Sequence, residues 1–171
     1  RDPAFNPEVV YSPDRTEYIK NLPFSKGDGH AVRGGKQETI ADITPKYMED
    51  LDQRWMKYGV EFINKMAKSD KPFFIYWASY AQQVAGSEEY KNAPFVDRAN
   101  AQSSFMAMHN AHVRQLLDTL KQEGVAENTL VVWWSDNGPM YAFWPTSGYS
   151  WLKGGKGSVT EGGVRVPAMA W

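Results

Sequence analysis

A chain of 171 residues, 42% of them hydrophobic, is long enough to form one domain with a buried core, or part of one. Its formal net charge of −1 provides no basic excess of the kind that binds nucleic acid or an anionic membrane surface, so we expect neither partner. The absence of cysteine excludes disulfides, thiolate metal sites and a cysteine nucleophile from these residues.

Residues 1–44 show little periodicity and contain four prolines and a glycine-rich stretch from Lys26 to Lys36. They are predicted to form an irregular, loop-rich segment of the same domain as residues 45–171. A patternless opening of this length is unusual in a compact domain, and we expect the sequence to begin within something larger.

A helix is predicted over residues 45–68, with Thr44 as its cap and Pro45 at its first position. Apolar residues recur there at three- and four-residue steps: Met48, Leu51, Trp55, Tyr58, Phe62 and Met66. The polar residues between them are expected to face solvent: Glu49, Asp50, Asp52, Arg54 and Lys57.

Apolar strands alternate with helices along the rest of the chain. Residues 73–78 and 130–134 have the composition of buried strands, and residues 98–123 form a second helical pattern that ends at Gly124. Residues 164–171 resemble a further strand. This order predicts an α/β layered fold with a mainly parallel mixed sheet.

The apolar run Thr129–Trp134 ends abruptly in Asp136 and Asn137, followed by Gly138 and Pro139. Ligand sites gather at the carboxyl ends of strands in open α/β sheets. Carboxylate and amide oxygens are ligands that Ca²⁺ or Mg²⁺ prefers. The alternative is a turn in which both side chains bond to the backbone, and residue type alone favours that simpler reading.

Two lysines, Lys153 and Lys156, lie among glycines that let the backbone approach closely, and a lysine there can act as a point charge on an oxyanion. A flexible, solvated loop is the simpler alternative. His109 and His112 stand three residues apart on the second helix, where packing is a better explanation than metal ligation.

Two segments together resemble the C-terminal signature of the type I sulfatases, the arylsulfatase-like members of the alkaline phosphatase superfamily. They are Ser135–Pro139 and, some fourteen residues later, Lys153–Pro167. Asp70–Tyr76 and Glu127–Val131 also resemble segments of that family. The resemblance covers about residues 45–171 and implies an alkaline-phosphatase-like fold.

The resemblance implies that Asp136 and Asn137 bind calcium, with magnesium as the alternative ion, and that Lys156 contacts the sulfate ester. It further implies a formylglycine nucleophile made from Cys or Ser in Cys/Ser-x-Pro-x-Arg. That motif is absent here, so we expect it in a missing N-terminal portion and expect the 171-residue chain alone to be inactive.

One position departs from the family pattern. Gln83, or less favourably Gln82, stands where the family usually has a histidine. Glutamine can hydrogen-bond a sulfate oxygen but cannot act as a general acid.

Three functions therefore stay open. The first is hydrolysis of a small-molecule or glycan sulfate ester, and the second is hydrolysis of a phosphate mono- or diester. The third is a degenerate member that only binds sulfated glycans. The resemblance suggests a periplasmic or secreted protein, and the sequence gives no oligomeric state.

Overall fold

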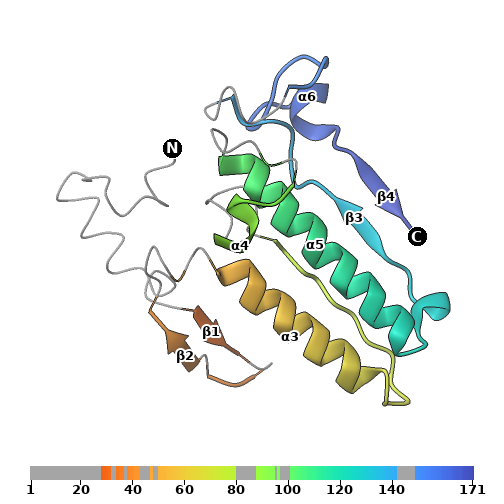
Figure 1. Ribbon diagram of the computed structural model, residues 1–171. Coiled ribbons are helices and arrows are strands. Elements are labelled where there is room, and N and C mark those ends of the chain that lie inside the picture. Colours follow the sequence, from red (N-terminus) through yellow and green to blue (C-terminus); the bar gives the residue numbers. More distant parts are fainter. Residues whose placement is uncertain are drawn as a thin grey trace.

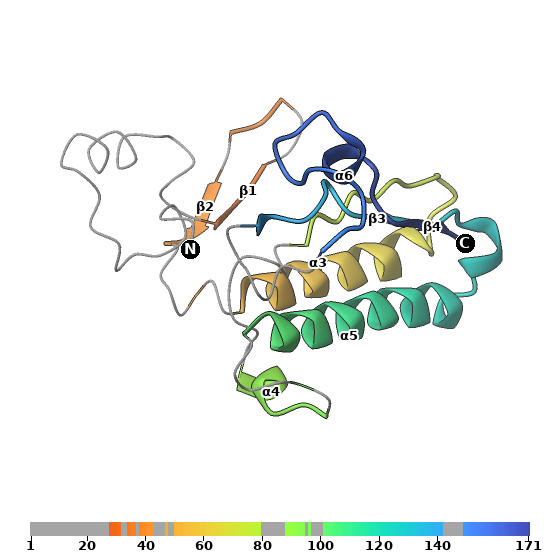
Figure 2. The same ribbon diagram turned by 90° about the horizontal axis from the view of Figure 1, so that it is seen from above.

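The computed structural model describes residues 28–31, 34–36, 38–42, 47, 50–79, 88–94, 96, 101–141 and 149–171. Two long helices, α3 (Leu51–Met66) and α5 (Ala101–Gln122), lie side by side and run in the same direction (Figures 1 and 2). Apolar residues buried in and around this pair form the described core: Leu51, Met56, Ile63, Phe105, Met108 and Leu120. Both predicted helices are confirmed over these ranges, while Thr44 and Pro45 lie outside the described residues.

A thin β-layer covers one side of the helix pair (Figure 2). It contains β3 (Val132–Trp134), which pairs antiparallel with β4 (Ala168–Ala170), Trp133 facing Met169. A short 3₁₀ turn, η2 (Ala126–Asn128), connects α5 to this layer, and Gly124 before it has the positive φ of 73° predicted for a helix end.

Residues 73–79 run beside β3 in the same direction in both views (Figures 1 and 2). Half-buried and exposed residues alternate along them, which is the period of a strand with one covered face. Aromatic contacts hold the segment in place, with Phe73 edge-on to Phe62 and Tyr76 beside Trp134.

The strand pairing differs from the prediction of a mainly parallel sheet. Both described strand pairs are antiparallel, and residues 73–78 do not form a ladder with either. Side-chain contacts, rather than ladder hydrogen bonds, attach this segment to its neighbours. The predicted strand over residues 164–171 is shorter than expected, because Glu161–Val164 form the one-turn helix α6 and β4 begins only after Pro167.

Smaller elements complete the described part. An antiparallel pair, β1 (Asp28–His30) and β2 (Glu38–Ala41), lies within the stretch predicted to be irregular, and α4 (Glu88–Lys91) contacts α5. Among the described helices, none combines the length and the apolar character needed to cross a membrane.

Candidate active-site rim after strand β3

The turn that follows β3 presents polar side chains at the edge of the β-layer. Asp136 is exposed and Asn137 is half-buried. The turn is stabilised internally, since Ser135 Oγ donates to the Asn137 carbonyl at 2.9 Å and Asn137 Nδ2 donates to the Gly138 carbonyl at 2.9 Å. Of the two side-chain bonds in the simpler alternative, the one from Asn137 is therefore present, and the Asp136 carboxylate stays exposed.

Backbone hydrogen bonds join this turn to the glycine-rich segment. The Gly138 amide donates to the Gly163 carbonyl at 3.0 Å, and the Lys156 amide donates to the Pro139 carbonyl at 2.9 Å. The two segments of the sulfatase-like signature are thus directly bonded. We call the polar residues Asp136, Asn137 and Lys156 on these joined segments the rim.

Glycine is required here because backbone meets backbone. A Cβ on Gly138 would collide with the Gly162 carbonyl oxygen, and a Cβ on Gly155 would lie 2.5 Å from the Pro139 carbonyl oxygen. A Cβ on Gly162 or Gly163 would likewise collide with carbonyl oxygens of the glycine-rich segment. Gly162 and Gly163 lie in α6 without positive φ, so they serve this close contact rather than a tight turn.

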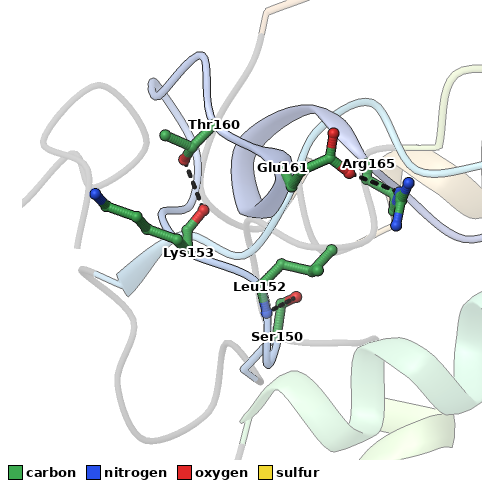
Figure 3. A network of polar contacts seen from close by, with 6 residues as sticks. All are labelled: Ser150, Leu152, Lys153, Thr160, Glu161 and Arg165. Carbon is green, nitrogen blue, oxygen red and sulfur yellow. Dashed lines mark hydrogen bonds and ion pairs between the residues drawn. The ribbon is translucent and has the colours of Figure 1, made fainter.

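The segment leading to Lys156 is itself tightly bonded (Figure 3). The Lys153 carbonyl accepts hydrogen bonds from Thr160 Oγ1 at 2.6 Å and from the Gly162 amide at 2.8 Å. Lys153 therefore holds α6 through its backbone, while its side chain extends away from that helix (Figure 3). Lys156 is exposed, and Gly157 after it has a φ of 88°.

Arg165 has a surface role in the described part of the chain. Its Nε lies 2.7 Å from Glu161 Oε2, four residues earlier, and both side chains are more than half exposed (Figure 3). This exposed ion pair excludes a buried structural role for Arg165.

The described rim contains one carboxylate, one amide and one ammonium group. No group of three or more His, Cys, Asp or Glu side chains capable of holding a metal occurs among the described residues. Asp136 and Asn137 have the oxygen chemistry that a hard divalent cation prefers, but Ca²⁺ takes six to eight oxygens. They can therefore supply only part of a metal site. Gln83 lies outside the described residues, and its predicted role stays a prediction.

A polar network that was not predicted lies beneath the rim. Asp52, expected to face solvent, is only 2% exposed and accepts a 2.5 Å hydrogen bond from Ser79 Oγ. Ser79 Oγ in turn lies 3.1 Å from His109 Nδ1, and Trp133 Nε1 donates to His109 Nε2 at 3.0 Å. The helical spacing contained the signal, because Asp52 lies next to Leu51 and four residues before Met56, both of them buried.

His109 and His112 do not form a metal pair. Both ring nitrogens of His109 are engaged by Ser79 and Trp133. His112 is 1% exposed and packs edge-on against Trp77 and Tyr90. Burial lowers the pKa of both histidines below the usual 6.5, and the Asp52 carboxylate offsets this only in part. Packing, the favoured reading, is confirmed.

Comparison with known proteins agrees with the signature. The sulfatase family model matches residues 5–171. The chain is 34% identical to human arylsulfatase A over 137 residues, covering 76% of this chain and 26% of that protein. It is 32% identical to N-acetylgalactosamine-6-sulfatase of Canis lupus familiaris over 129 residues, covering 71% of this chain and 24% of that protein.

Two solved structures share the fold. The PsFucS1 sulfatase from Pseudoalteromonas sp. superposes with a TM-score of 0.72 at 34% identity, over 84% of this chain and 29% of that one. Ps i-CgsB in complex with k-i-k-neocarrahexaose gives a TM-score of 0.57 at 27% identity, over 80% of this chain and 29% of that one. The chain spans roughly a quarter of the length of the curated relatives. The chain belongs to the sulfatase family, and its described fold is part of the alkaline-phosphatase-like fold of that family.

Proposed function

We propose that the full-length protein hydrolyses sulfate esters and that Asp136, Asn137 and Lys156 form part of its metal and sulfate site. The observation that supports this is the pair of backbone bonds, Gly138 to Gly163 and Lys156 to Pro139, which joins two oxygen ligands and a lysine in one rim. A turn stabilised only for its own sake would not need a cation-bearing loop bonded to it.

The charges suit a sulfate ester. Asp136 and Asn137 would hold calcium, or magnesium, and the bound ion would neutralise charge on the sulfate oxygens. Lys156, whose amide bonds the Pro139 carbonyl, would bind the same sulfate group and stabilise negative charge that develops as the ester oxygen leaves. The formylglycine nucleophile would come from the part of the protein that these residues do not include.

We propose a sulfated glycan as the natural substrate class, with a small-molecule sulfate ester as the alternative. The support is the similarity to a protein named N-acetylgalactosamine-6-sulfatase and to one crystallised with a neocarrahexaose. A periplasmic or secreted location would give the enzyme access to such glycans, and that location is part of the proposal.

Turnover of an aryl sulfate by the full-length protein tests the role of Lys156. Lys156→Ala should lower kcat/KM by about 100-fold or more, the usual effect of removing one group that stabilises developing charge. Lys153→Ala is the matched control, because it removes the same charge from the same loop while keeping the backbone carbonyl that bonds Thr160 and Gly162. Equal losses in both variants would contradict the assignment.

The same assay separates the alternatives. A phosphate ester hydrolase would turn over an aryl phosphate faster than the aryl sulfate. A degenerate glycan-binding member, suggested by Gln83 at the usual histidine position, would turn over neither and would still bind sulfated oligosaccharides.

A further inference from the structure

In the polar network of Trp133, His109, Ser79 and Asp52, every hydrogen bond runs in the same direction from donor to acceptor. The indole Nε1–H of Trp133 can only donate, so His109 Nε2 must accept and carry no proton. The proton of a neutral His109 then resides on Nδ1 and is donated to Ser79 Oγ, whose own hydroxyl is donated to Asp52 Oδ2. Donors and acceptors match along the whole series from Trp133 to Asp52, and such series strengthen cooperatively.

Packing fixes the imidazole ring in this arrangement. The Trp77 ring stacks on His109 with 5.6 Å between centroids and 6° between planes. The Trp133 ring lies 6.2 Å from the His109 ring, between centroids, and is tilted by 50°. His109 therefore has little freedom to rotate, and both of its hydrogen bonds hold the partners in place.

Each of the two bonding partners of His109 closely precedes, in the sequence, a residue assigned to the proposed site. Trp133 comes three residues before Asp136, and Ser79 is the last described residue before the stretch that contains Gln83. Asp52 attaches the network to α3, and His109 attaches it to α5.

We propose that His109 is a positioning residue that fixes the turn bearing Asp136 and Asn137 relative to the segment that ends at Ser79, by bonding Trp133 on one side and Ser79 on the other. The inference rests on the proposed function for the importance of those two segments. Its physical content, a shared attachment point for both, is independent of any activity.

Hydrogen exchange of the full-length protein tests this attachment. His109→Phe keeps a flat ring for Trp77 to stack on and removes both hydrogen bonds. We expect backbone exchange in residues 73–79 and 135–141 to rise together by about tenfold, the factor that loss of a buried hydrogen bond produces. His109→Gln, which retains one acceptor and a donor, should restore slow exchange in at least one of the two segments.

Leu120→Ala is the control for general destabilisation, because Leu120 is 5% exposed on the same helix but far along it from the network. It should leave exchange in both segments unchanged at a matched distance from the unfolding midpoint. If His109→Phe does not accumulate, Ser79→Ala gives a narrower test in which exchange rises in residues 73–79.

Nitrogen-15 spectra of the imidazole provide a second readout, which should place the proton on Nδ1 at pH 7. A proton on Nε2 would overturn the proposal, as would His109→Phe affecting neither segment or affecting the chain as uniformly as Leu120→Ala. Calcium and aryl sulfate are absent from these measurements, so failure of the proposed function would not be mistaken for failure of this inference.

Discussion

The absence of a side chain at Gly138 allows the turn after β3 to bond the glycine-rich segment. Gly138 is buried, and the carbonyl of Gly162 occupies the space that a side chain would need. The hydrogen bond from the Gly138 amide to Gly163 depends on the same close approach. Residue 138 thus controls how closely the turn that bears Asp136 approaches the glycine-rich segment.

Gly138→Ala should lower the free energy of unfolding by about 1–3 kcal/mol, because backbone atoms on both sides must move to admit the methyl group. Gly59→Ala is the matched control, since its new Cβ would meet only the flexible Leu116 side chain at 3.1 Å and would gain helix propensity within α3. Thermal unfolding of the full-length protein measures both. Equal free energies of unfolding for the two variants would contradict the requirement for glycine at position 138.

His112 provides a second test at the scale of one residue. It is 1% exposed, and among the described residues neither of its ring nitrogens has a hydrogen-bond partner. Burial lowers its pKa and that of His109, so the folded protein holds both neutral where the unfolded chain takes up protons. The contribution of the two neutral histidines to the free energy of unfolding is therefore fully present above the unfolded pKa of about 6.5. It declines as the pH falls below that value.

Replacing His112 by Leu should raise the free energy of unfolding at pH 7 by about 1 kcal/mol, because two unsatisfied buried nitrogens disappear. It should also make stability less sensitive to pH between 7 and 5. Denaturant unfolding at both values measures this. A steeper decline in the variant than in the natural protein would contradict the neutral state assigned to His112.

At the scale of elements, the β-layer has one covered face and one apolar face open to solvent. Along residues 73–79 and 129–137 the half-buried positions face the helices, while the alternate positions are exposed. Large apolar side chains dominate the exposed set: Phe74, Tyr76, Leu130, Val132 and Trp134. Phe74 is 84% exposed and Leu130 78%, far more than isolated surface positions require.

The 171-residue chain expressed alone should therefore self-associate through this face. A double substitution, Phe74→Ser with Leu130→Ser, should lower its association state, because it removes the two most exposed side chains of the set without touching the helix side. Substituting Val159, which is 96% exposed outside the layer, by Ser is the control. Sedimentation that finds all three proteins equally monomeric would contradict this view of the face.

Across the whole molecule, the elements that were predicted correctly are those whose hydrophobic periodicity lies within a single segment. Both long helices and the β3 region follow from apolar patterns that one segment carries by itself. The antiparallel pairing of β3 with β4 could not be predicted, since pairing joins segments more than thirty residues apart. The one-turn helix α6 is too short to show a helical period.

The site divides in the same way. Asp136, Asn137 and Lys156 were predicted as site residues because two segments of the sequence resemble the type I sulfatases. The structure adds the backbone bonds that join these segments. Asp52 was missed as a buried group because an acidic residue beside an apolar stripe is usually solvated, and the Ser79 hydroxyl that bonds it comes from a segment 27 residues away.

Calcium titration of the full-length protein tests the central claim most directly. Asp136→Ala should weaken calcium binding by more than about tenfold, because it removes the only carboxylate of the described rim. Asp70→Ala, which removes an exposed carboxylate from the turn after α3, should leave the affinity unchanged. Calcium affinity that is the same in Asp136→Ala as in the natural protein would contradict the metal site proposed here.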